Sequence, residues 1–201
     1  MKLKICNHEL ELKKFPIIIF SNYRTGSTAL GYYLAKKTGL PFLNEPIYEH
    51  HKKYLDLLLS YRESDNKNYI LNFMAEHAEQ DDFYKKILEE DSFKIKLQRK
   101  NKIDQISSFY IAYMTDNWAT INTTNVNEYD IKIDLYAIKH AIKKILYSDS
   151  LLDSCKTKFD FSLIYEDLGF LDDIHLKLTI PPKNITLIKK LVKTLLPRHD
   201  L

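Results

Sequence analysis

The sequence has little cysteine and no long apolar run, and each absence excludes a class of protein. Its two cysteines, Cys6 and Cys155, are too few for a disulfide framework and do not have the spacing of metal ligands. No stretch approaches the roughly 20 apolar residues that a membrane-spanning helix needs. Residues 1–15 alternate charged and apolar side chains, whereas a signal peptide would carry a continuous apolar block. We therefore expect a cytoplasmic protein with no membrane span.

A strong excess of one charge sign is also missing. The 30 basic and 27 acidic residues leave a net charge of +3 and are spread along the chain, so we expect neither nucleic acid nor a membrane surface as a partner. Arginine is scarce among the basic residues, which are otherwise lysines: the arginines are Arg24, Arg62, Arg99 and Arg198. An arginine kept in such a chain is a candidate for a role that needs its planar fork, which lysine cannot imitate.

The length and composition predict one globular domain over residues 1–201, because 201 residues with 45% hydrophobic side chains can bury a sizeable core. Short apolar runs typical of strands buried on both faces occur at 16–21, 69–73, 93–97 and 159–165. Helical spacing of apolar residues occurs at 29–37, 103–113, 135–146 and 185–195. This alternation predicts an α/β fold: a three-layer sandwich around a central, mainly parallel sheet, similar to P-loop nucleotide-binding domains.

The segment after the first strand combines groups that bind phosphate. Where a parallel strand enters a helix through a tight turn, the first helical N–H groups point outward at the positive end of the helix dipole. Gly26 permits close approach to the backbone, and Ser27 and Thr28 add hydroxyl donors beside the charge of Arg24. The ATP-binding pattern G-x-x-x-x-G-K-[ST] needs a first glycine and a lysine that are missing here, which disfavours an ATP site. The alternative is that Ser27 caps the helix and Arg24 is a surface charge.

A second anion site is predicted at the end of the strand at 93–97. Arg99 follows this strand at the carboxyl edge of the sheet, where open α/β sheets bind their ligands. Ser107 lies two turns into the next helix and can reach the same anion. Two anion sites on one sheet edge indicate a ligand with two separated phosphate-like groups.

Four segments together resemble sulfotransferases, especially the carbohydrate and bacterial glycolipid types. Residues 17–28 resemble the loop that binds the 5′-phosphosulfate, and residues 97–107 resemble the 3′-phosphate motif, with an arginine and a serine eight residues later. Asn44-Glu45-Pro46 and Tyr165-Glu166-Asp167-Leu168 are similar to two further segments of these enzymes. The chain departs from the pattern at Asn22-Tyr23, where many relatives have a proline, and after Leu168, where the loop that closes over the nucleotide has no clear match.

The resemblance implies transfer of a sulfuryl group from 3′-phosphoadenosine 5′-phosphosulfate to an acceptor hydroxyl, with no metal. The acceptor is expected to be a small molecule or glycan, and the family favours a carbohydrate or glycolipid. Arg24 is expected to stabilise the leaving 5′-phosphate, and Arg99 and Ser107 to hold the 3′-phosphate. The residues expected to bind the 5′ end of the donor are Arg24, Thr25, Gly26, Ser27 and Thr28.

A hydroxyl acceptor loses its proton during transfer, and Glu45 is the expected base. An acid at the start of a helix headed by Pro46 is the alternative for Glu45, and the alternative bases are Glu49, His50 and His51. Two rival functions stay open: a nucleotide or small-molecule kinase with a degenerate phosphate loop, and a non-catalytic nucleotide-binding protein of the same fold. The sequence leaves the identity of the acceptor and the oligomeric state undetermined.

Overall fold

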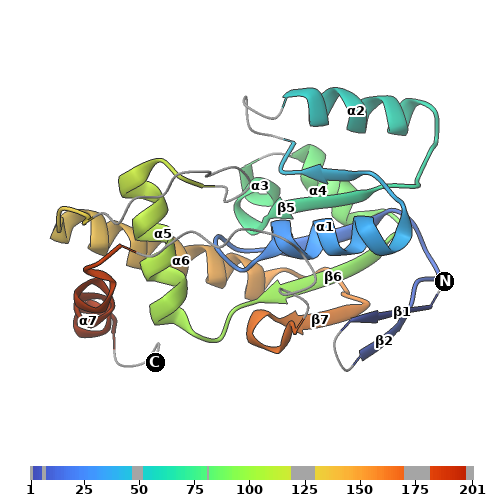
Figure 1. Ribbon diagram of the computed structural model, residues 1–201. Coiled ribbons are helices and arrows are strands. Elements are labelled where there is room, and N and C mark those ends of the chain that lie inside the picture. The colour runs from blue at the N-terminus through green and yellow to red at the C-terminus, as the bar shows by residue number, and fades with distance from the viewer. Residues whose placement is uncertain are drawn as a thin grey trace.

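A computed structural model describes residues 2–5, 8–46, 52–80, 82–118, 130–169 and 182–197 (Figure 1). Its centre is a five-stranded sheet in which every neighbouring pair is parallel. The strands lie in the spatial order β4 (Phe42–Asn44), β5 (Ile70–Met74), β3 (Ile17–Ser21), β6 (Phe93–Gln98) and β7 (Phe161–Ile164). The predicted parallel sheet is thereby confirmed, and the strands predicted from Ile17 and Ile95 are parallel neighbours.

The helices of the described chain are α1 (Ser27–Thr38), α2 (Lys52–Glu63), α3 (Ala75–Gln80), α4 (Asp82–Glu89), α5 (Lys102–Thr115), α6 (Leu135–Ser154) and α7 (Ile185–Leu195), with a 3-10 turn η2 (Tyr165–Asp167). Four of them, α1, α5, α6 and α7, lie where the apolar spacing of the sequence predicts a helix. Helix α1 ends at Gly39, which takes the left-handed φ of 74° and donates its N–H to the Ala35 carbonyl. No helix among the described residues is long and apolar enough to span a membrane.

Two pieces of sheet were not predicted from the sequence. Strand β4 has only three residues, too few to show a strand pattern. The antiparallel hairpin of β1 (Lys2–Ile5) and β2 (His8–Glu11) uses the alternation of the N-terminal segment to bury Leu3, Ile5 and Leu10. This hairpin packs on the same apolar cluster as α1.

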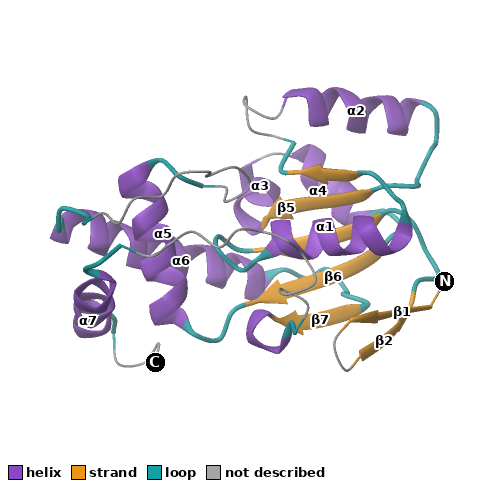
Figure 2. Cartoon of the chain, viewed as in Figure 1, coloured by secondary structure: helices purple, strands orange, loops and turns teal. Residues whose placement is uncertain are grey.

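The two faces of the sheet are covered by different elements, which gives the three layers (Figure 2). Ile17 and Ile19 of β3 pack in one cluster with α1 and the hairpin. Ile18 and Phe20 point to the other face and pack with α4 and the end of α6. Because successive side chains of a strand point to opposite faces, a strand covered on both sides must be apolar throughout, as β3 is.

From the carboxyl ends of β3 and β6, the chain continues toward opposite edges of the sheet. From β3 the chain passes through α1 to the β4 edge, and from β6 it passes through α5 and α6 to the β7 edge. Helices α5, α6 and α7 share a third apolar cluster. In Figure 1 they lie beyond the arrowheads of these strands. Ligands of open α/β sheets bind at such a divergence.

Candidate functional site

The loop between β3 and α1 holds two residues in the left-handed region. Arg24 has a φ of 57° and Gly26 a φ of 81°, with Thr25 between them. A left-handed non-glycine residue costs roughly 1–2 kcal/mol, so the surroundings must hold Arg24 in place. In the described chain, no acceptor receives the backbone N–H groups of residues 25–28. Successive N–H groups in such turns, ahead of a helix, form an anion-binding site.

The alternative in which Ser27 caps α1 is wrong. Gly26 occupies the cap position, and no side chain accepts a hydrogen bond from the first turn of the helix. Ser27 Oγ instead lies 3.2 Å from Asn72 Nδ2 of the neighbouring strand β5. The first amides of α1 are therefore not consumed by a protein cap.

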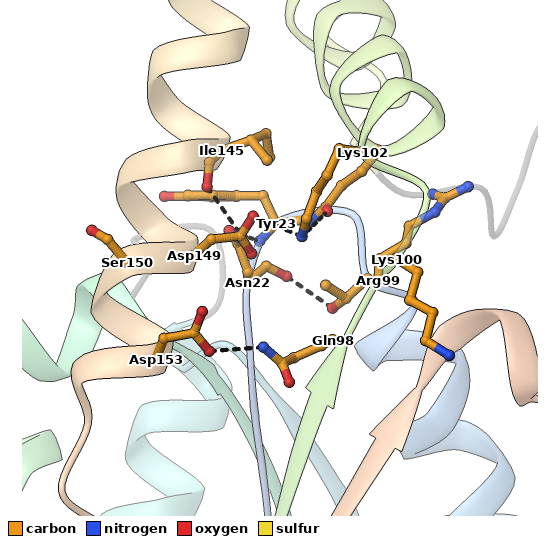
Figure 3. Close-up of polar contacts among 12 residues, drawn as sticks. Asn22, Tyr23, Gln98, Arg99, Lys100, Lys102, Ile145, Asp149, Ser150 and Asp153 are labelled. Carbon is orange, nitrogen blue, oxygen red and sulfur yellow. Dashed lines mark hydrogen bonds and ion pairs between the residues drawn. The ribbon is translucent and has the colours of Figure 1, made fainter. Parts of the chain in front are cut away.

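Asn22 and its partners fix the start of this loop (Figure 3). Asn22 is fully buried, and its Nδ2 donates to Asp149 Oδ1 at 2.8 Å and to the Ile145 carbonyl at 3.2 Å, both on α6. Its own carbonyl accepts the Thr25 hydroxyl at 2.9 Å. Lys102 at the start of α5 pairs with Asp149 at 2.7 Å, so the loop, α5 and α6 are joined through one carboxylate.

Tyr23 makes the second set of restraints. Its carbonyl accepts Gln105 Nε2 at 2.7 Å, and its hydroxyl donates to the buried carboxylate of Glu76 at 3.1 Å. Lys144 of α6 neutralises that carboxylate at 2.5 Å. Hydrogen bonds to α3, α5 and α6 therefore restrain Asn22 and Tyr23.

Arg24 turns from the loop toward α5. Its Nε donates to Ser108 Oγ at 2.9 Å and its Nη1 to the Trp118 carbonyl at 2.7 Å. Burial lowers the pKa of the Arg24 guanidinium, and the neighbouring positive charge of Arg99 lowers it further. Arg24 is thus a positioned and partly desolvated cation, and the alternative in which it is an unattached surface charge is wrong.

Arg99 reaches the same loop from the end of β6. Its Nη1 donates to the Arg24 carbonyl at 3.1 Å, and its guanidinium lies 4.6 Å from the centre of the Tyr165 ring. Tyr165 in turn packs on Gly26 so closely that a Cβ there would lie 2.5 Å from the ring. Loop, Arg99 and Tyr165 therefore form one packed unit, and only glycine fits position 26.

Glu166 has a structural place beside this unit. Its carboxylate accepts the amide hydrogens of Lys100 at 3.0 Å and Asn101 at 2.9 Å and lies 3.6 Å from Arg99 Nε. Burial raises the pKa of Glu166, but the two amides and Arg99 outweigh it, so the pKa stays below its ordinary value. A carboxylate with a lowered pKa, whose two oxygens accept these amides, holds the turn after β6 and is a weak base.

Two adjacent serines lie on α5, and of the two only Ser108 makes a hydrogen bond to Arg24 among the described residues. Ser107, the residue singled out by the sequence, is 1% exposed, and its hydroxyl has no hydrogen-bond partner among the described residues. Ser108 is the serine that Arg24 contacts, and sequence reasoning missed it. The doubled serine within the mainly apolar stretch 106–112 was the available signal.

Glu45 follows β4 directly and is held by β5. Its N–H donates to the Asn72 carbonyl at 2.9 Å, its φ is 47°, and its Oε1 lies 3.5 Å from Asn72 Nδ2. Burial raises the pKa of Glu45 to about 7, and the charge of Arg24 opposes part of this rise. Glu45 therefore lies directly after the carboxyl end of β4, and the helix start expected at Pro46 would run into residues 47–51, which lie outside the described residues. The alternative bases Glu49, His50 and His51 lie outside the described residues.

The structure brings Arg24, Arg99 and Glu45 together at one edge of the sheet, whereas the Ser107 hydroxyl makes no hydrogen bond to them. Arg24 and Arg99 are in contact, Glu45 lies within the electrostatic reach of Arg24, and Ser107 is next to the serine that binds Arg24. Asn72 was missed, although a lone amide in the apolar strand 70–74 was a visible signal. In the part of the chain with described side chains, no group of three His, Cys, Asp or Glu residues could hold a metal ion.

Comparison with known proteins shows no family for this chain. No family model matches the chain, and no curated protein matches it. Among solved structures, an uncharacterized protein from Eubacterium ventriosum is similar over 89% of this chain and 96% of that chain, at 9% identity and a TM-score of 0.41. This similarity is too distant to indicate a family or an activity.

The raised pKa of Glu45 predicts a pH dependence of stability. The ordinary value is 4.5 and the folded value about 7, so between them the folded chain keeps a proton that the unfolded chain has lost. Stability should therefore fall as the pH rises from 4.5 to 7, by about 3 kcal/mol for a shift of this size. Glu45→Gln removes this fall, so the free energy of unfolding of the variant, relative to that of wild type, should rise by about 3 kcal/mol between pH 4 and pH 8, as measured by urea denaturation.

The exposed Glu63 on α2 offers the matched control, because Glu63→Gln also removes one carboxylate. A difference between Glu45→Gln and wild type that is the same at both pH values would show that Glu45 ionises normally in the folded protein.

Proposed function

We propose that the protein is a sulfotransferase that moves the sulfuryl group of 3′-phosphoadenosine 5′-phosphosulfate to a hydroxyl of a carbohydrate or glycolipid. The observation that carries the proposal is the contact of Arg99 with the main chain of Arg24, on a loop where the N–H groups of residues 25–28 have no acceptor within the described chain. Two cations that repel each other beside unsatisfied amides favour an anion of more than one negative charge. A donor with a 5′-phosphosulfate and a 3′-phosphate has such charges at two places.

The residues present fit the two ends of this donor. The amides of residues 25–28 and the guanidinium of Arg24 would hold the 5′ group, where charge builds as the sulfur–oxygen bond to the phosphate breaks. Arg99 and the buried, unpaired hydroxyl of Ser107 would hold the 3′-phosphate. All of these groups are donors, as an anionic ligand requires.

Glu45 would accept the proton of the attacking hydroxyl. The acceptor oxygen forms a bond to sulfur, the bond from sulfur to the 5′-phosphate breaks, and the hydroxyl proton passes to the Glu45 carboxylate. A base works best when its pKa lies near the working pH, and the pKa of Glu45 is about 7. The kinase alternative is less favoured because the cations at this loop are arginines and the lysine of ATP-binding loops is missing.

Loss of Arg99 should weaken binding of a nucleotide that carries the 3′-phosphate more than binding of one that lacks it. A lost charge-assisted hydrogen bond should reduce the affinity of Arg99→Ala for 3′-phosphoadenosine 5′-phosphate roughly tenfold to a hundredfold, and that of Ser107→Ala by less. The affinity of both variants for adenosine 5′-phosphate should change little. Calorimetry with both nucleotides measures the difference.

Arg62 provides a control for the removal of one guanidinium, since it pairs with Glu90 on another part of the protein. Arg62→Ala should bind both nucleotides as wild type does. Equal losses for the two nucleotides in Arg99→Ala would contradict the assignment of the 3′-phosphate.

Loss of Arg24 should lower turnover beyond any effect on donor affinity, and loss of the Glu45 carboxylate should lower turnover while donor binding survives. With a chelator present, release of 3′-phosphoadenosine 5′-phosphate is followed with glucose, N-acetylglucosamine and their octyl glycosides as acceptors. Arg24→Ala should lower kcat at saturating donor, and Arg24→Lys should recover part of it, since charge builds on the leaving group only during transfer. Glu45→Gln should lower kcat about 10²–10⁴-fold while donor binding survives.

Two outcomes would contradict this function. Turnover of ATP that depends on magnesium would favour a kinase. Tight binding of 3′-phosphoadenosine 5′-phosphate without transfer to any of these acceptors would favour the non-catalytic alternative.

A further inference from the structure

Asn72 is a polar residue at a buried position in the middle of an otherwise apolar strand. It is the middle residue of β5, whose five residues are all buried, and it lies between Ile19 of β3 and Asn44 of β4. An amide buried without full hydrogen bonding costs roughly 1–3 kcal/mol. Asn72 is fully buried, and its Oδ1 has no partner in the described chain. A leucine would pack here without that cost, so the amide requires an explanation beyond packing.

The amide nitrogen of Asn72 lies within reach of three acceptors, two of them on consecutive residues at the end of β4 and the third at the start of α1. Nδ2 is 2.8 Å from Asn44 Oδ1, 3.2 Å from Ser27 Oγ and 3.5 Å from Glu45 Oε1. Two N–H groups serve these three acceptors, so the hydrogen bonds are shared. Ser27 is the first residue of α1 and belongs to the loop of the anion site.

The main chain of Asn72 holds the same acid. The Asn72 carbonyl accepts the N–H of Glu45 at 2.9 Å, directly after β4 ends. Asn72 thus contacts Glu45 through its backbone and through its side chain, while the same side chain contacts the anion loop. One residue joins the two parts of the site that the transfer reaction would need to align.

We propose that Asn72 is a positioning residue that ties the carboxylate of Glu45 to the loop at the start of α1. The role of Glu45 as a base rests on the proposed function, whereas the tie itself is a property of the folded chain. An N–H that donates to a carboxylate favours its ionised form, so Asn72 acts on the protonation of Glu45 as well as on its place.

The other groups around Glu45 make this contribution measurable. Arg24 is the charged side chain of the described chain that acts on the ionisation of Glu45, and it favours the charged form. Asn44 and Thr28 of the adjoining elements are neutral, with the Thr28 hydroxyl 3.4 Å from Asn44 Oδ1. Removing the Asn72 amide leaves Arg24 in place and takes away one donor to the carboxylate.

The test follows the titration of Glu45 by carbon-13 NMR of the labelled carboxyl group, assigned with Glu45→Gln. Asn72→Leu keeps the number and branching of the side-chain heavy atoms and removes the amide, and we expect the pKa of Glu45 to rise by about one unit. Asn72→Thr, whose short side chain cannot reach Glu45, should give the same direction. Phe73→Leu of the same strand controls for a weakened core, and it should leave the titration of Glu45 unchanged.

Activity separates positioning from general damage. In Asn72→Leu, kcat should fall at least about tenfold, while affinity for 3′-phosphoadenosine 5′-phosphate should fall much less, because the loop keeps its ties to α5 and α6. An unshifted Glu45 titration in both Asn72 variants would overturn the proposal. If wild type did not bind the nucleotide while the titration still shifted, the tie would stand and the proposed function would fail.

Discussion

The electrostatic repulsion between the guanidinium groups of Arg24 and Arg99 is the constraint on which the site depends. Arg99 donates to the main chain of Arg24, so the structure brings two cations together where burial already disfavours the charge of Arg24. Such an arrangement is held against its own repulsion by the Tyr165 ring under Arg99, by Glu166 beside it, and by the hydrogen bonds that hold Asn22 and Tyr23. If an anion binds here, as the proposed function requires, these contacts already hold the two cations in place and little rearrangement is needed.

The sheet explains why distant parts of the sequence meet here. Parallel strands place all their carboxyl ends at one edge, so the residues after β3, β4 and β6 become neighbours although they are up to 75 positions apart. The loop after β3 supplies amides and Arg24, the end of β4 supplies Glu45, and the end of β6 supplies Arg99. Strand β5 lies between the β3 and β4 contributions, which is why Asn72 can contact both.

The sequence predicted the sheet well because strands buried on both faces are continuous apolar runs. Ile17, Ile18 and Ile19 show this directly, and the four predicted apolar runs became β3, β5, β6 and β7. The proximity of Arg99 to the loop between β3 and α1 was predictable for a related reason, because the carboxyl ends of parallel strands share one edge of the sheet. Strand β4 was missed because three residues are too few to show a periodic pattern. The contacts of Ser108 with Arg24 and of Asn72 with Glu45 were missed because they depend on tertiary packing, which the local sequence does not reveal.

The central claim is that one ligand with two separated phosphate groups occupies this edge. A crystal structure of the protein with 3′-phosphoadenosine 5′-phosphate tests it most directly. The account predicts the 5′-phosphate against the amides of residues 25–28 and Arg24, with the 3′-phosphate against Arg99 and Ser107. A nucleotide bound elsewhere, or one whose 3′-phosphate leaves Arg99 in its present contact with Tyr165 and points to solvent, would contradict the account.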